Sequence, residues 1–290
     1  WEILRNCNVF LENYQKADIS LAEKNKYAGE AKLFRAWFYF DKTKKFGNTP
    51  WVSNSLNIDS PELYGPRDSR ELVMDSVLAD INFAVQYLPE DWKAGLPGRL
   101  NKWCALALKS RICLFEGTYR KYHGGTNPNT WLTEAASAAK QLMDANVFML
   151  HSTGEPDSDY GFIFQQQDLS GNPEVIYWRK YLLGFITNGI QSGIQQAVGG
   201  ASKDMVEDYL CTDGKPITQS PLYQGDDHLE DVFVNRDPRL RQSVLHPGDK
   251  DKINFGNLIN DTKSYPRFSG MEGLYTTTSG YHLIKHFTVV

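Results

Sequence analysis

The sequence predicts an all-α fold, an irregular α–α superhelix of helix pairs with a loop-rich, minor-β segment packed on it. Three observations support this prediction. Helical periodicity and helix-ending residues recur through residues 1–150. Small residues gather on one expected helix, where they would let a neighbouring helix come close. From residue 151 to 290, Gly, Pro, Asn, Asp and Ser interrupt the chain every few positions. We therefore expect a helical scaffold over 1–150 and a loop-rich part over 151–290.

The composition is that of an ordinary globular protein and excludes several functional classes. Of the 290 residues, 41% are hydrophobic and 23% are charged, and the formal net charge is −4. Because the charge is mildly acidic and no long Lys/Arg block occurs, we expect no nucleic-acid partner. The longest apolar stretches fall well short of the roughly 18 residues of a membrane span. No CxxC pair exists among the four cysteines, which we expect to be small apolar fillers.

The first well-marked helix is expected over residues 30–46. Good helix formers fill it, lysines occupy its last turn, Gly47 follows its end and Pro50 lies beyond. Residues Asp68 to Glu71 are typical of a capping box that opens the next helix. This second helix has an apolar stripe and is ended by Pro89. The stripe consists of Val73, Val77, Ile81, Ala84 and Leu88.

Two further helices are expected over residues 100–115 and 131–145. The first has apolar residues on most sides and should be central, with Gly117 ending it. The second is rich in alanine, and Asn146 is expected to cap it. Helix pairs joined by turns, with small residues on the second helix, suggest stacked antiparallel pairs of the tetratricopeptide type. The repeat is not a strict 34 residues, so we expect an irregular array.

The loop-rich part offers few regular elements. Residues 174–178 could form a strand and residues 203–209 a short helix. So much irregular chain in a compact protein is typical of a functional loop layer laid over a rigid scaffold.

No motif in the chain predicts a catalytic residue, a metal site or a cofactor. His282 and His286 are four residues apart, but Leu283 stands where a zinc protease has Glu. The acidic cluster Asp226 to Asp231 lacks the spacing of a calcium-binding loop, and we expect a solvated turn there. Nucleophile-elbow, Walker and dinucleotide-binding motifs are all missing from the sequence. Two of the 35 carboxylates could still form a glycosidase pair, because sequence cannot place them.

Aromatic and cationic residues alternate in two places and suggest ligand surfaces. Tyr and Trp rings can stack on the apolar face of a sugar, while Arg and Lys donate to its hydroxyls. The alternative is a buried strand, or a helix end, whose rings pack on the scaffold. The candidate ligand-binding residues are Trp178, Arg179, Tyr181 and Phe185 in the loop-rich part, with Tyr119 and Tyr122 after the third helix.

Arg236, Asp237 and Arg239 form a compact charged turn around Pro238. An Asp before Pro favours an extended or turn conformation. Its carboxylate can bind both arginines or cap the turn that follows. We interpret the three residues as a structural pin that holds a loop to the helices, with direct ligand contact as the alternative.

Several motifs occur in the order found in one known family. They span most of the chain, and shorter matches lie at 80–88, 172–176, 205–216 and 279–285. The longer ones are Glu30-Ala-Lys-Leu-Phe-Arg-Ala-Trp-Phe-Tyr-Phe, Phe46-Gly-Asn-Thr-Pro-Trp-Val, Gly98-Arg-Leu-Asn-Lys-Trp-Cys-Ala and Asn235-Arg-Asp-Pro-Arg-Leu. The chain resembles the SusD/RagB family of outer-membrane nutrient-binding lipoproteins of Bacteroidetes.

The resemblance implies tetratricopeptide-like helix pairs under a loop-rich segment, and a protein that is not an enzyme. It also implies glycan binding at the cell surface and delivery to a SusC-like, TonB-dependent outer-membrane transporter. Three alternatives remain, namely peptide capture by a RagB-like member, an α-rich glycoside hydrolase, and an interaction scaffold with no small ligand. Family members are longer than 290 residues, so we expect a leader, a lipidated cysteine, N-terminal helices and a final helix pair outside this sequence. The membrane contact would be made only through that upstream lipid anchor.

Overall fold

The computed structural model describes residues 1–92, 98–181, 184–197, 199–247, 249, 277 and 279–287. The chain divides into two compact units. The helical unit contains Trp1–Met149 and Val175–Trp178, and the loop-rich unit contains Leu150–Glu174 and Arg179–Val290. The predicted all-α class is confirmed, because helices dominate and each strand among the described residues has only two residues.

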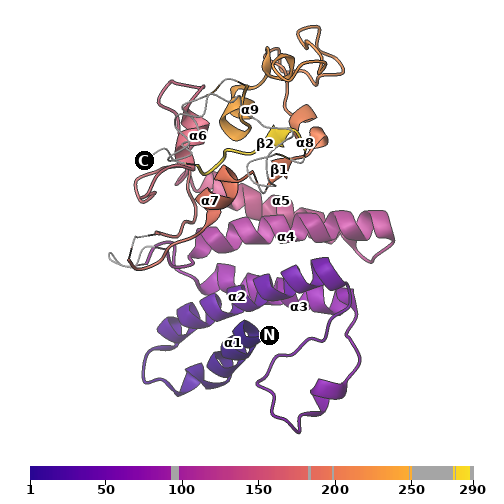
Figure 1. Ribbon diagram of the computed structural model, residues 1–290. Helices are drawn as coiled ribbons and strands as arrows, with labels where there is room; N and C mark the ends of the chain where they lie inside the picture. The colour runs from indigo at the N-terminus through magenta and orange to yellow at the C-terminus, as the bar shows by residue number, and fades with distance from the viewer. Residues whose placement is uncertain are drawn as a thin grey trace. The chain divides into compact units, whose positions relative to one another are not determined.

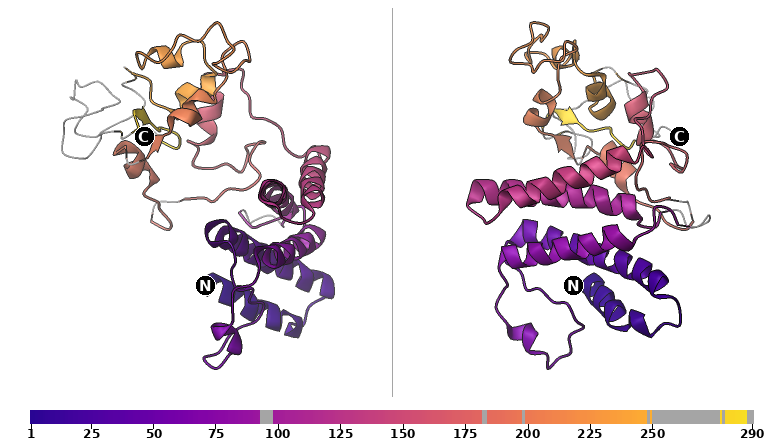
Figure 2. Two further views of the ribbon diagram at one scale, coloured as in Figure 1. Left: turned by 90° about the vertical axis from the view of Figure 1, so that its right-hand side faces the viewer. Right: turned by 180° about the vertical axis from the view of Figure 1, so that it is seen from behind.

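Helix pairs build the helical unit. Helices α2 and α3 pack together as one pair, and α4 and α5 pack as a second pair (Figure 1). Helix α1 packs on α2, and α3 packs on α4, so that the pairs stack in chain order as the sequence predicted (Figure 2). The elements are α1 (Glu2–Asn13), η1 (Tyr14–Lys16), α2 (Leu21–Phe46), η2 (Pro61–Tyr64), α3 (Arg70–Tyr87), α4 (Lys102–His123) and α5 (Pro128–Asp144).

The start of α3 differs from the predicted capping box. Ser69 is the N-cap, and its hydroxyl accepts from the Leu72 amide at 3.3 Å. Asp68 instead accepts from the Trp51 amide at 2.7 Å. The Glu71 carboxylate accepts from the amide and the hydroxyl of Thr126, each at 2.7 Å. The capping-box prediction is therefore wrong, because both carboxylates find donors on distant segments.

Gly117 does not end the third helix, contrary to the prediction. It lies buried inside α4, which continues to His123 and ends at Gly124 with φ +78°. A Cβ on Gly117 would lie 2.8 Å from the side chain of Leu132 in α5. The missing side chain therefore lets α5 approach α4 closely.

A buried ion pair joins the helices of the first pair. Arg35 of α2 binds Asp80 of α3 with two hydrogen bonds, Nε to Oδ2 at 2.7 Å and Nη2 to Oδ1 at 3.0 Å. Lys32 adds a third contact at 2.7 Å. Arg35 Nη1 also donates to Asn8 of α1 at 3.1 Å, and Asn8 donates to the Val52 carbonyl at 2.9 Å. This network ties α1, α2, α3 and the loop after α2 together.

A second network joins the two helix pairs. Glu116 of α4 is fully buried and binds Arg70 at 2.6 Å and Arg120 at 2.7 Å. Arg120 reaches Asp75 of α3 at 2.8 Å and donates to the carbonyl of Thr126 at 3.2 Å. The apolar stripe predicted on α3 is buried in the hydrophobic core of the helical unit, and each of its five residues is at most 4% exposed.

The loop-rich unit has short elements linked by irregular chain. Strands β1 and β2 pair antiparallel, with Gly200 opposite His282. The predicted short helix at 203–209 is confirmed as α8. The elements are α6 (Asp159–Ile163), α7 (Ile190–Gln195), β1 (Gly200–Ala201), α8 (Lys203–Glu207), η3 (Asp231–Phe233), α9 (Pro238–Ser243) and β2 (Tyr281–His282).

The strand predicted over 174–178 does not form. Residues 175–178 are irregular and belong to the helical unit. Ile176 packs on Trp103 and Leu106 of α4, and its carbonyl lies 3.8 Å from the Cys104 sulfur. Packing of this segment on a helix therefore takes the place of strand pairing.

All four cysteines are free and buried, as expected for apolar fillers. Among the helices that the structure describes, none combines the length and apolar character needed to cross a membrane.

Candidate functional site

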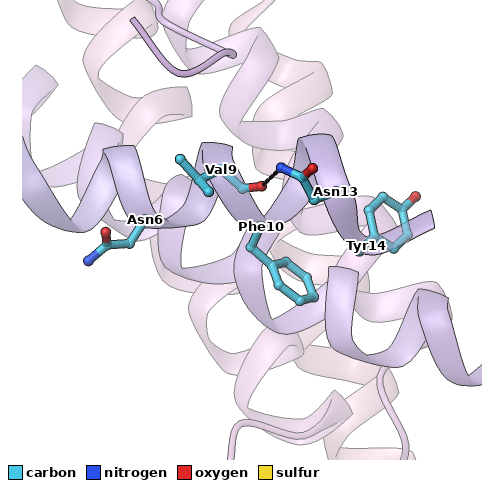
Figure 3. A pocket seen from close by; sticks show the side chains of 5 residues that line it. All are labelled: Asn6, Val9, Phe10, Asn13 and Tyr14. Carbon is cyan, nitrogen blue, oxygen red and sulfur yellow. Dashed lines mark hydrogen bonds between the residues drawn. The ribbon is translucent and has the colours of Figure 1, made fainter. Parts of the chain in front are cut away.

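An open groove of about 460 Å³ lies along α1 and η1 of the helical unit. Figure 3 shows the five side chains that line it, namely Asn6, Val9, Phe10, Asn13 and Tyr14. The rings of Phe10 and Tyr14 are 6.0 Å apart and inclined by only 25°. Asn13 donates to the Val9 carbonyl at 2.7 Å, which fixes its amide at the edge of the groove. Flat rings beside amides are a combination that can bind a sugar.

This groove was not predicted from the sequence. A signal was present, because Phe10 and Tyr14 are four residues apart, as are Asn6 and Phe10, and such pairs share one side of a helix.

The predicted residues Tyr119 and Tyr122 lie near the end of α4 and have different surroundings. The Tyr119 ring is 6.4 Å from Phe115 and 4.5 Å from His123. The guanidinium of Arg70 lies 3.5 Å from the Tyr119 ring centre and covers one of its faces. Tyr122 is 74% exposed. Of the two, Tyr122 therefore offers the freer ring to a ligand.

In a third aromatic group, the rings of Tyr27 and Trp92 are contacted by the protein's own Arg99. Arg99 lies 3.7 Å from the ring centre of Trp92 and 5.2 Å from that of Tyr27. It also pairs with Glu30 of α2. The hydrogen bonds that Arg99 donates to the Glu30 carboxylate raise the pKa of Arg99 above its ordinary value. Because Arg99 stacks on both rings, this group is better suited to joining α2 to the start of α4 than to binding a ligand.

The predicted residues of the 178–185 segment fall into two units. Trp178 is half-buried in the helical unit, whereas Arg179, Tyr181 and Phe185 belong to the loop-rich unit. Leu182 and Leu183 between them lie outside the described residues. The Arg179 guanidinium is 5.8 Å from the Tyr181 ring centre. Tyr181 is 42% exposed and Phe185 is 84% exposed, so both rings are open to solvent.

In the charged turn around Pro238, Asp237 caps the turn that follows it, which is one of the two arrangements that the sequence allowed. Arg236 is buried and donates to three backbone carbonyls, those of Val206 at 2.6 Å, Tyr209 at 2.9 Å and Val232 at 3.1 Å. Asp237 caps α9 by accepting from the Arg239 amide at 2.9 Å. The contacts of Arg236 therefore join α8, η3 and α9 within the loop-rich unit.

Asp237 binds only one of the two arginines. The Arg239 side chain donates to its carboxylate, and this bond lowers the pKa of Asp237 below its ordinary value. The network is consistent with a structural pin inside the loop-rich unit.

Metal-binding residues do not gather in the part of the chain that the structure describes. No group of three or more His, Cys, Asp or Glu side chains is placed there to hold an ion. His282 is buried in β2, and its Nε2 lies 2.6 Å from the Ile194 carbonyl. Asp226 of the acidic cluster is paired with Lys203 of α8.

The fold thus defines a class of protein, a tetratricopeptide-like helical scaffold joined to a loop-rich unit. Residues 2–114 match the SusD-like family model described as starch-binding and associating with the outer membrane. A SusD-like protein of Formosa agariphila is 23% identical over 121 residues, which are 41% of this chain and 23% of that protein.

Solved structures agree with this match. A SusD-like carbohydrate-binding protein of Bacteroides fragilis NCTC 9343 superposes with a TM-score of 0.69 at 22% identity, covering 98% of this chain and 52% of that one. A second SusD-like protein from the same strain has a TM-score of 0.63 at 23% identity, covering 83% of this chain and 47% of that one. The matches confirm the resemblance to the SusD/RagB family that was predicted from the sequence. The chain spans about half the length of these two structures.

Proposed function

We propose that the protein captures a glycan outside the cell without cleaving it and delivers it to a SusC-like, TonB-dependent transporter. The observation that carries this proposal is the match of residues 2–114 to a family described as starch-binding and associating with the outer membrane. A lipid anchor would hold the protein at the outer membrane.

The exposed rings support glycan capture. Tyr122, Tyr181 and Phe185 present aromatic faces to solvent, and the α1 groove adds Phe10 and Tyr14. A stacked ring contributes about 1 kcal/mol. Micromolar affinity corresponds to about −8 kcal/mol, so several rings and hydrogen bonds must act together.

The test is a glycan-array screen of the full-length protein, followed by calorimetry with the best glycan. We expect Trp178→Ala, Tyr181→Ala and Phe185→Ala each to weaken binding by about fivefold, equivalent to about 1 kcal/mol, without unfolding the protein. Tyr64→Ala is the matched control, because Tyr64 is an 82% exposed ring on η2 outside the candidate surfaces. Unchanged affinity in a variant would reject that position. Binding of peptides in place of every glycan would support the RagB-like alternative.

A further inference from the structure

The turn after β2 holds a non-glycine residue in a conformation that favours glycine. Residues Ile284 to Phe287 form a turn closed by a hydrogen bond from the Phe287 amide to the Ile284 carbonyl at 3.0 Å. His286, the third residue of the turn, has φ +74°. A positive φ at this position is the signature of a type II turn, which normally has Gly there. Such strain persists where the surrounding structure imposes it, and it often marks functional sites.

The ends of this turn are firmly held. Ile284 and Phe287 are 5% and 3% exposed and pack with Leu245 in a small core of the loop-rich unit. The Ile284 amide donates to the Ser243 carbonyl at 2.9 Å. Lys285 and His286, at the tip of the turn, therefore lie between two residues that are fixed by packing.

The tip lies against an aromatic face of α6. Tyr160 and Phe164 are four residues apart, and their ring centres are 5.1 Å from each other. Lys285 Nζ is 3.9 Å from the Phe164 ring centre and donates to the Tyr160 hydroxyl at 2.7 Å. The His286 ring meets Phe164 edge-on at 5.0 Å. Four side chains from two segments thus form one aromatic and cationic cluster.

Among the described residues, Lys285 forms no ion pair with a carboxylate. Two acids of the same unit are already engaged. Asp159 accepts from the amide and hydroxyl of Thr153, and Asp237 is bound by Arg239. The hydrogen bond to Tyr160 uses one of the three ammonium protons, which leaves two for a ligand. The protein as a whole has a net charge of −4, whereas the half-buried ammonium of Lys285 is a local positive charge.

We propose that the cluster of Tyr160, Phe164, Lys285 and His286 binds the carboxylate of an acidic sugar, so that the captured glycan contains uronic acid residues. In this arrangement the ammonium of Lys285 pairs with the sugar carboxylate, and the rings of Tyr160 and Phe164 hold the ammonium in place. This inference rests on the proposed glycan capture. The role of the cluster can nevertheless be tested separately from glycan capture itself.

The experiment uses the full-length protein and calorimetry with oligomers of galacturonate, glucuronate and mannuronate. Each oligomer is paired with its methyl ester, which has the same sugar ring without the charge, and neutral oligosaccharides are measured alongside. We expect at least one acid form to bind at least tenfold more tightly than its ester, because a charge-assisted hydrogen bond is lost in the ester. Added salt should weaken binding of the acid form.

Substitutions test whether the preference for the acid form over the ester arises from this cluster. We expect Lys285→Gln to abolish the difference between acid and ester, and Lys285→Arg to retain part of it. Lys140→Gln, which removes an exposed lysine of α5, should leave the difference unchanged. His286→Gly should preserve or raise thermal stability, because it relieves the positive φ, while weakening binding of the acid form several-fold.

Three results would overturn the inference. The first is binding of neutral glycans with no preference for any acid form. The second is a preference for the acid form that survives in Lys285→Gln. The third is the absence of binding to any glycan, which would also overturn the proposed function, whereas the first two would leave that function standing.

Discussion

At the residue scale, Asp80 is the counter-ion shared by two cations of α2. It is 3% exposed and binds Arg35 and Lys32 at 2.7 Å each. The substitution Asp80→Asn would leave Arg35 buried without its counter-ion. Because breaking one side of a buried ion pair costs about 3 kcal/mol, we expect the free energy of unfolding in urea to fall by that amount.

The matched control for this substitution is Asp41→Asn. Asp41 is on α2, the helix that carries Arg35 and Lys32, and it also pairs with a lysine, Lys45 at 2.9 Å, but in solvent. We expect no measurable change in stability, because exposed pairs contribute little. Equal losses in Asp80→Asn and Asp41→Asn would contradict the role assigned to the buried pair.

His282 gives the loop-rich unit a specific dependence on pH. Burial lowers the pKa of His282 below its ordinary value of 6.5, outweighing the hydrogen bond to Ile194. The unfolded chain therefore binds a proton at this position more readily than the folded chain. It follows that the stabilisation is complete above about pH 6.5 and is lost as the pH falls from there toward the lower folded pKa.

We expect the thermal midpoint of the wild type to drop between pH 7 and pH 5, and the drop to be smaller in His282→Gln. His286, whose pKa burial also lowers, accounts for part of the remaining dependence. His228→Gln serves as the control, because His228 is exposed and its loss should leave the pH dependence intact. An unchanged drop in His282→Gln would refute the assignment.

At the element scale, Gly117 sets the distance between α4 and α5. Alanine favours helix over glycine by about 1 kcal/mol, but its Cβ here would meet Leu132 at 2.8 Å. We expect Gly117→Ala to lower the free energy of unfolding by about 1–3 kcal/mol, as overpacking does elsewhere. Urea unfolding monitored by circular dichroism measures this directly.

Gly193 provides the comparison within a helix. A Cβ on Gly193 in α7 would meet no atom within 4 Å. Gly193→Ala should therefore be neutral or stabilising, by up to about 1 kcal/mol. If both alanine variants were stabilising, the close approach of α5 to Gly117 would be refuted.

Helix ends were predictable wherever the signal is local. Gly47 ends α2 with φ +68°, and Pro89 follows the end of α3, both as predicted. The beginning of α2 at Leu21 was missed, although Ser20 and Glu23 have capping-box spacing and the Ser20 hydroxyl caps the Glu23 amide. The roles of Gly117 and Glu71 were not predictable, because each is decided by a residue far away in the chain, Leu132 for one and Thr126 for the other.

The candidate site was less accessible to sequence reasoning than the fold. Trp178 and Arg179 are adjacent in sequence but belong to different units, and the alternation of aromatic and cationic residues gave no sign of this boundary. Arg70, which covers Tyr119, comes from a helix that begins far from Tyr119 in sequence. The cluster at Lys285 depends on a positive φ and on α6, and neither is visible in the residues around position 285.

At the scale of the whole molecule, stacked helix pairs form a scaffold and the loop-rich unit presents side chains to solvent. Buried ion pairs at Asp80 and Glu116 hold the helices, while open rings such as Phe185 remain available. This division is what a binding protein requires, because contact residues on loops can vary without disturbing a packed core.

The central claim is that the protein binds a glycan and leaves it intact. The most direct measurement is calorimetry of the full-length protein with the glycan selected on an array, followed by chromatography of the recovered ligand. We expect micromolar affinity, about −8 kcal/mol, and ligand of unchanged length. Shortened products, or no binding to any glycan, would contradict the claim.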